Sequence, residues 1–152
     1  MVFPSIFKEE INAAIIARIE QLTPDSSAKW GKMDIAQMLA HCNVTYEMLY
    51  EDKHKRPNIF VRFLLRLLVK SIVTNEKSYK KNTLTAPAFL IADKKQFEIE
   101  KTRLIAYLHR TQQLGSAHFE GLASNSFGNL NSKEWNNLFY KHLDHHLSQF
   151  DV

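Results

Sequence analysis

The chain has 152 residues, of which 45% are hydrophobic and 24% charged, and its formal net charge is +4. This length and composition are typical of one folded domain, residues 1–152, and exclude a disordered or low-complexity chain. Residues 53–81 hold nine Lys or Arg and one acidic residue, so this segment has a net charge of +8. Because the whole chain has a net charge of +4, the remaining residues have a net charge of 4 − 8 = −4. This local basic patch argues against a globally basic nucleic-acid-binding protein.

Cysteine usage and the N-terminus predict the compartment. The single cysteine, Cys42, rules out an intrachain disulfide and fits a reducing environment. The first residues lack the basic and apolar regions of a signal peptide. No run reaches the roughly 18–20 apolar residues that a membrane span needs. We therefore expect a cytoplasmic protein without a membrane span.

The first two predicted helices are separated by a breaker. Only four Gly and four Pro favour long regular elements, and the apolar residues recur with helical spacing. The first helix is predicted over residues 5–21, and Thr23-Pro24-Asp25 ends it. Asp34 is the predicted N-cap of the second helix. Gln37 stands three residues further on, as in a capping box.

The segment that follows the second helix is the least regular. Residues 59–73 predict a helix that is apolar on nearly every side, except for a ridge of Arg62, Arg66 and Lys70. This helix either packs on the rest of the molecule or buries itself against a second copy in a homodimer. Residues 74–92 are expected to form a long connection with at most short structure.

Two further helices complete the chain. Asp93 and Gln96 predict a second capping box for a helix that continues to about Gln113, where Gly115 can close it. Residues 115–130 are expected to be a loop, and Asn131 with Glu134 predicts the cap of the last helix. The predicted class is all-α: a four-helix bundle with an additional helix in the crossover between the second and third main helices.

The last helix carries three of the seven histidines within five residues. A helix turns about 100° per residue, so His142 and His146 share one face with the apolar residues of this helix, which are Trp135, Leu138, Phe139, Leu143, Leu147 and Phe150. His145 lies roughly 120° from the centre of that face. Two imidazoles therefore point inward, and each needs a partner because an unpaired buried polar group costs about 1–3 kcal/mol. A metal ion bound by neutral imidazole is one such partner.

A third histidine can join this pair. His41 lies on the flank of the apolar face of the second helix and can point into a seam between helices. We hypothesise a metal site made by His41, His142 and His146. Three nitrogen ligands leave a fourth position for water, which is the arrangement of catalytic zinc. Imidazole also suits nickel and iron, so zinc or nickel is favoured without being fixed.

Plainer interpretations of these residues stay open. A His-x-x-x-His pair on a helix is more often ordinary packing, and histidines in a last turn can complement the helix dipole. His54, His109 and His118 are expected in surface or loop positions. Cys42 is expected to be an inert core thiol, because an apolar environment opposes thiolate formation.

Three stretches of the chain together resemble a known superfamily. They are Trp30-Gly31-Lys32-Met33 with Gln37-Met38-Leu39-Ala40-His41-Cys42, then Phe127-Gly128-Asn129-Leu130 with Glu134-Trp135, then His142-x-x-His145-His146-x-x-Gln149-Phe150. This combination resembles the DinB/YfiT-like superfamily, in a branch catalogued only as a domain of unknown function. The resemblance covers most of the chain and is weakest over residues 55–92.

The resemblance implies a four-helix bundle, often dimeric, that holds a divalent metal through His41, His142 and His146. It also implies an activity, because characterised relatives include metal-dependent hydrolases and thiol S-transferases that join small thiols to electrophiles. The expected partners are a small-molecule substrate, a low-molecular-weight thiol and a second copy of the chain. Ser124 and Asn125 replace the His-Pro that this branch tends to carry, so no further ligand is expected there.

The expected function is thus a divalent-metal-dependent hydrolase or thiol transferase with a three-histidine site. No general base can be named, because the spacing of Tyr46 and Glu47 from His41 places neither at the metal. The alternative is a non-catalytic binding or dimerisation module with a vestigial or absent metal site. Binding of an anionic membrane or nucleic acid through residues 53–81 is the weakest hypothesis, because a charge run is usually a solvated face.

Overall fold

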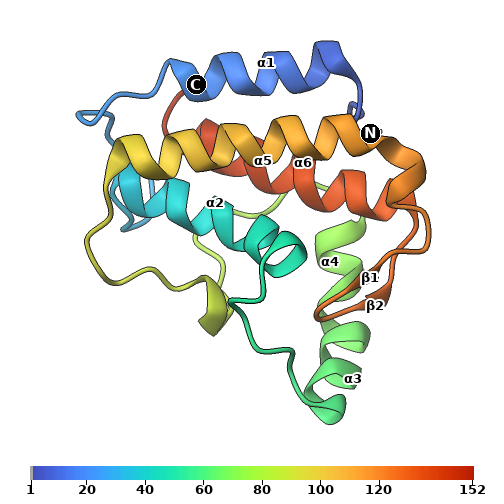
Figure 1. The fold of residues 1–152 in the computed structure, drawn as a ribbon. Coiled ribbons are helices and arrows are strands. Elements are labelled where there is room, and N and C mark those ends of the chain that lie inside the picture. The colour runs from blue at the N-terminus through green and yellow to red at the C-terminus, as the bar shows by residue number, and fades with distance from the viewer. Residues whose placement is uncertain (1) are drawn as a thin grey trace.

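Helices make up most of the computed structural model, which describes residues 2–152 (Figure 1). The elements in chain order are α1 (Glu9–Glu20), α2 (Ile35–Tyr50), α3 (Ile59–Leu68), α4 (Lys70–Thr74), the 3₁₀ helix η1 (Pro87–Phe89), α5 (Phe97–His118), β1 (Ala123–Ser124), β2 (Gly128–Asn129) and α6 (Ser132–Gln149). The expected all-α class is confirmed, with one small antiparallel β1–β2 hairpin added. Within the described residues, none of the helices is both long and apolar enough to cross a bilayer.

Four long helices enclose the core. Both α5 and α6 contact α1 and α2, so the four helices share one apolar interior. Aromatic side chains fill its centre: Tyr46 stacks on Phe139 with ring centroids 5.1 Å apart, and Phe119 meets Phe139 edge-on at 5.6 Å. All three side chains are fully buried. This packing fixes how α2 and α6, the two histidine-bearing helices, face each other.

The starts of the two histidine-bearing helices agree with the sequence. The Gln37 amide donates to Asp34 Oδ1 and the Glu134 amide to Asn131 Oδ1, both at 2.8 Å, and both capping boxes are complete. The capping box expected at Asp93 and Gln96 is wrong. There α5 begins after Gln96, which makes no side-chain cap, and Asp93 instead pairs with Lys95 at 2.8 Å.

Other boundaries differ by a few residues. The first helix begins at Glu9 instead of near residue 5, because residues 6–8 form a turn and bend. Gly115 has a φ of 71° and interrupts α5, as expected of a residue that closes a helix. A further turn nevertheless continues α5 to His118. The expected loop 115–130 contains the β1–β2 hairpin, whose strands of two residues are too short to leave a periodic pattern.

The helix predicted over residues 59–73 is two helices. It breaks at Val69, and the two pieces behave differently. The second piece, α4, packs on α6, whereas α3 projects away from the four-helix core and has no buried residue (Figure 1). Ordinary packing of α3 on the bundle, one of the two expected alternatives, is therefore wrong for this helix.

A buried lysine attaches α4 to α6. The Lys141 side chain is 2% exposed, and its Nζ donates to the carbonyls of Ile72 at 2.6 Å and Asn75 at 3.1 Å and to Asn75 Oδ1 at 3.0 Å. The Asn137 amide adds a bond to the Thr74 carbonyl at 2.8 Å. These donors satisfy the carbonyls at the end of α4. Burial lowers the pKa of Lys141 to about 8.

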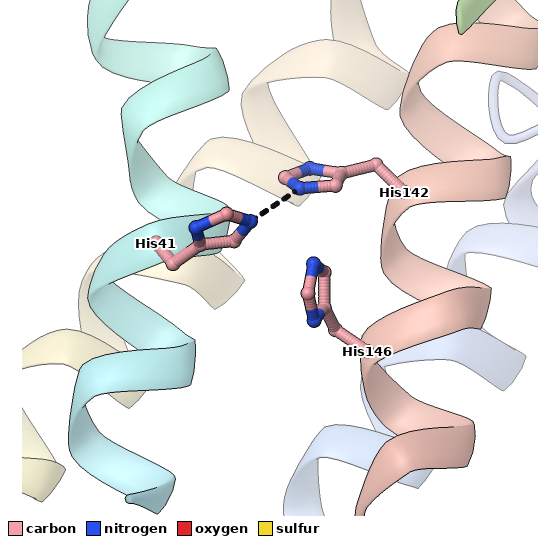
Figure 2. A group of neighbouring side chains, drawn as sticks. All are labelled: His41, His142 and His146. Carbon is pink, nitrogen blue, oxygen red and sulfur yellow. Dashed lines mark hydrogen bonds between the residues drawn. The ribbon is translucent and has the colours of Figure 1, made fainter. Parts of the chain in front are cut away.

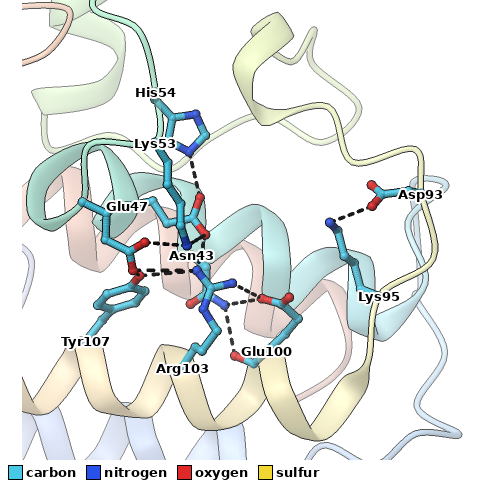
Figure 3. A network of polar contacts seen from close by, with 10 residues as sticks. Asn43, Glu47, Lys53, His54, Asp93, Lys95, Glu100, Arg103 and Tyr107 are labelled. Atoms are coloured by element: carbon cyan, nitrogen blue, oxygen red, sulfur yellow. Dashed lines mark hydrogen bonds and ion pairs between the residues drawn. The ribbon is translucent and has the colours of Figure 1, made fainter.

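A polar network joins α2 to α5 (Figure 3). Glu47 accepts from Arg103 and from His54, the latter at 2.7 Å. Arg103 Nη1 also donates to Glu100 Oε2 at 2.8 Å, and the Asn43 amide meets the same oxygen at 2.8 Å. Glu47 is therefore a structural carboxylate. His54, which lies in the connection between α2 and α3 as expected for a loop residue, is its partner.

We expect Lys141→Met to destabilise the protein by about 2 kcal/mol, because it leaves the carbonyls at the end of α4 without donors in a buried position. This corresponds to a fall in melting temperature of about 5 °C in thermal unfolding followed by circular dichroism. Lys133→Met on the same helix is the matched control, since it removes only a surface pair with Glu76. Equal losses in the two variants would contradict this role of Lys141.

Candidate metal centre

The three predicted histidines come together between α2 and α6 (Figure 2). His41 comes from α2, and His142 and His146 lie one turn apart on α6. One ring nitrogen from each lies within 4.8 Å of the other two, and the Nε2 atoms of His41 and His142 are 2.9 Å apart. The structure thus confirms that the rings converge, which spacing could not establish for His41.

The proton on His41 is fixed by a backbone carbonyl. Nδ1 of His41 lies 2.9 Å from the carbonyl oxygen of Phe89 in η1. A carbonyl only accepts, so this nitrogen must carry the proton and donate. The neutral ring then has its lone pair on Nε2, which is the atom that faces His142.

The proton on His146 is fixed through a glutamine amide. Nδ1 of His146 lies 2.9 Å from Gln149 Oε1, and Gln149 Nε2 donates to the Trp30 carbonyl at 2.5 Å. The second bond sets the orientation of the amide, because only its nitrogen can donate to a carbonyl. Its oxygen must therefore accept from His146 Nδ1, and Nε2 of His146 keeps the lone pair that points at the other two rings in Figure 2.

The hydrogen-bond partner of His142 can act as either donor or acceptor. Nδ1 of His142 lies 3.2 Å from Thr45 Oγ1, and a hydroxyl can donate or accept. If Thr45 donates, His142 carries its proton on Nε2 and donates to Nε2 of His41. If Thr45 accepts, the proton lies on Nδ1 and all three Nε2 lone pairs face one point. A cation between them would favour the second arrangement.

Burial keeps the three rings neutral. Desolvation lowers the pKa of His41, lowers the pKa of His142 well below its usual value, and lowers the pKa of His146 to about 3. Repulsion from neighbouring imidazoles lowers the pKa of each further. Neutral imidazole is the form that binds metal ions, so the cluster needs no deprotonation at neutral pH.

The spacing fits a small divalent ion. Zinc binds imidazole nitrogens at 2.0–2.1 Å, which places tetrahedral ligand atoms about 3.3 Å apart. The observed separations, from 2.9 Å to within 4.8 Å, bracket this value. Among residues 2–152 this is also the one group of three or more His, Cys, Asp or Glu side chains close enough to share an ion. The three histidines can therefore hold a metal.

Phe89 was not predicted and covers the cluster. Its ring centroid lies 5.4 Å from that of His41 and 5.9 Å from that of His142. Its carbonyl orients His41, so one residue of η1 both shields and positions the site. The apolar run Ala88–Ile91 was the available signal, but nothing local in it indicates a contact with α2.

A small cavity lies beside the cluster. Its volume is about 200 Å³, and the residues that line it are Trp30, Ser78, Tyr79, Lys81, Lys141, Asp144, His145 and Ser148. His145 is half-buried and forms the link to the metal centre, because its ring centroid is 5.0 Å from that of His146. The same ring meets Trp30 and Tyr79 edge-on at 5.9 and 5.7 Å. His145 therefore forms part of the cavity wall, beside His146.

The other residues singled out by the sequence lie away from the cluster. Tyr46 is stacked in the core, and its hydroxyl has no hydrogen-bond partner among the described residues. Cys42 is buried with its Sγ 3.7 Å from Met38 Sδ, and burial raises the pKa of the thiol, as expected for a core cysteine. His109 and His118 are exposed, as predicted.

Gly31 allows the approach of Gln149, and we expect Gly31→Ala to disturb His146. A Cβ on Gly31 would lie 2.5 Å from Gln149 Nε2, and the residue has a φ of +84°. The displaced amide would release the proton of His146 from Nδ1. Imidazole ¹⁵N spectra of the metal-free protein should then show loss of the pure Nδ1–H form.

Gly121→Ala is the matched control for that variant. It imposes the same left-handed strain at a φ of +74°, but nothing lies within 4 Å of the new methyl group. Its His146 spectrum should match that of the wild type. Identical tautomer changes in both variants would refute the link from Gly31 to His146.

Comparison with known proteins identifies a family. The model of the family described as "Protein of unknown function (DUF1569)" matches residues 7–152, which include all three histidines. No curated protein and no solved structure matches the chain. The family description names no activity, and the DinB/YfiT-like resemblance stays a prediction. Because the match covers nearly the whole chain, the protein belongs to the DUF1569 family.

Proposed function

We propose that this protein is a divalent-metal-dependent enzyme of the DinB-like type that acts on a small molecule, as a hydrolase or a thiol S-transferase. One observation carries the proposal: protein oxygens contact Nδ1 of all three histidines, and one ring nitrogen from each histidine lies within 4.8 Å of the other two. A divalent cation bound there supplies Lewis-acid chemistry, because it polarises a substrate oxygen and lowers the pKa of a water or thiol that it binds.

The number of ligands favours catalysis over a purely structural ion. Structural zinc sites have four protein ligands, whereas catalytic sites keep three and leave one position for water or substrate. Within residues 2–152, no fourth His, Cys, Asp or Glu belongs to the cluster. The nearest further imidazole, His145, lies on the wall of the cavity.

The surroundings support a small substrate. The cavity of about 200 Å³ is lined by His145 and by none of the three ligands, and it is smaller than the 300–1,000 Å³ typical of pockets for drug-sized ligands. The Phe89 ring packs against the histidines. Thr45, Gln149 and the Phe89 carbonyl orient the three rings through hydrogen bonds to Nδ1. The DinB/YfiT-like resemblance supports the same two reaction classes and the bundle fold.

We expect purified wild-type protein to hold about one divalent ion per chain after dialysis, measured by inductively coupled plasma mass spectrometry. His41→Ala, His142→Ala and His146→Ala should each reduce the bound metal to near background, because each removes one of three ligands. His109→Ala is the control, since this histidine is exposed on α5. Wild-type metal content no higher than that of the ligand variants would remove the proposal.

The activity itself is tested on the same samples. Metal-free protein is reloaded with zinc, nickel or manganese and assayed with small esters and amides, and with a thiol plus an aryl halide. We expect turnover in one of the two assays that requires the ion and disappears in His142→Ala. A metal-loaded protein that is silent in both assays would favour the non-catalytic binding module over the enzyme.

Thr45→Val should weaken metal binding about 10- to 100-fold, because Nδ1–H of His142 loses its acceptor in a buried position. Thr45→Ser keeps the hydroxyl and should retain most of the affinity. Zinc titration against a competing chelator measures the two dissociation constants. Equal affinities for the Val and Ser variants would show that the Thr45 hydroxyl does not support the site.

A further inference from the structure

The surface of α3 is apolar and uncovered. Ile59 is 85% exposed and Phe60 67% exposed. Further large side chains that are more than half exposed follow along α3 and α4: Phe63, Leu67, Leu68 and Ile72. A soluble monomer rarely leaves so much contiguous apolar surface in water, and such patches mark sites of interaction.

The orientation of α3 is set by its polar ridge. The Arg66 side chain passes close to the β1–β2 hairpin, with Nε 3.6 Å from the position a Cβ would take on Gly128. Arg62 Nε is shielded from water. The polar side of the helix therefore meets the protein and the apolar side faces outward, the reverse of an ordinary surface helix. Lys141 anchors the adjoining α4, so this arrangement is held in place.

Unpaired basic residues flank the apolar surface. Lys55 and Arg56 are exposed immediately before α3, and Lys77 and Lys80 are exposed after α4. None of these four has a carboxylate within 4.0 Å among the described residues. The one acid of residues 53–81, Glu76, pairs with Lys133 on α6. The chain on both sides of the exposed apolar segment therefore carries exposed basic residues.

We propose that α3 is a docking element for the surface of an anionic lipid bilayer. The side chains of Phe60, Phe63 and Leu67 would enter the boundary between headgroups and acyl chains, and Lys55 and Arg56 would contact the anionic headgroups. The helix has 10 residues, a length of about 15 Å, so it lies in the plane of the membrane and does not cross it.

A second copy of the chain and a nucleic acid fit this surface less well than an anionic bilayer does. A symmetric dimer through α3 would bring the exposed, unpaired Lys55 and Arg56 of two copies toward one interface, and like charges across an interface are unfavourable. Nucleic acid would satisfy the charges but offers the exposed aliphatic side chains no apolar partner. An anionic bilayer satisfies both features at once. The homodimer expected from the sequence thus becomes one outcome of the test.

The test uses the full chain and sedimenting vesicles. Wild-type protein should bind vesicles of phosphatidylcholine with about 30% phosphatidylserine, and should bind pure phosphatidylcholine vesicles much less. Binding to the anionic vesicles should weaken as salt is raised, because salt screens the basic residues. The metal centre is not involved, so His142→Ala should bind like the wild type whether or not the proposed enzyme function holds.

Two double variants separate the apolar and charged contributions. Phe60→Gln/Leu67→Gln and Lys55→Glu/Arg56→Glu should each lower the partition coefficient on the order of tenfold or more. Ile99→Gln, which is exposed on α5, is the apolar control, and Lys8→Glu/Lys94→Glu reverses the same amount of charge elsewhere on the exposed surface. Both controls should bind like the wild type, and thermal melting verifies that all variants fold.

Three results would overturn the proposal. The first is a wild-type protein that binds neither kind of vesicle, and the second is equal binding by all variants and controls. The third is a dimer in sedimentation velocity that becomes monomeric in Phe60→Gln/Leu67→Gln, which would assign the surface to a second copy of the chain. Loss of binding in both double variants, with the controls unchanged, establishes the docking element.

Discussion

The hydrogen bonds that keep a proton on Nδ1 of His41 and His146 are the constraint on which the rest of the site depends. Their acceptors, the Phe89 carbonyl and the Gln149 amide, lie in η1 and at the end of α6. The amide is in turn held by the Trp30 carbonyl, which precedes α2. The segment before α2, α2 itself, η1 and the end of α6 must therefore pack together before the rings take these orientations.

Much of the site could be predicted from local rules. The 3.6-residue period places His142 and His146 on one face, and the capping boxes of Asp34 and Asn131 set where their helices begin. The roles of Phe89 and Gln149 could not be predicted, because they depend on where a long connection and a helix end lie in space. The capping box predicted at Asp93 was wrong for a related reason, because the Asp93 carboxylate pairs with Lys95.

One lysine connects the two unusual surfaces of the molecule. Lys141 holds the end of α4, which continues from the exposed α3, and its Nζ lies 4.6 Å from the centre of the Tyr79 ring. Tyr79 lines the cavity together with His145, next to His146. A shift of α4 would therefore reach the cavity wall through a short series of direct contacts. Burial of a cation at this junction ties the helix pair to the site.

The hydrogen bond from His41 to Phe89 tolerates amino-acid substitution at its acceptor residue better than the others do. Its acceptor is a main-chain oxygen, which every amino acid at position 89 would still provide. Natural variation at that position can thus change the aromatic cover without removing the acceptor that orients the ring. The Gln149 link has no such protection, since it needs one particular side chain and a neighbour at position 31 without a Cβ. Drift across homologues should consequently be freer at position 89 than at positions 31 and 149.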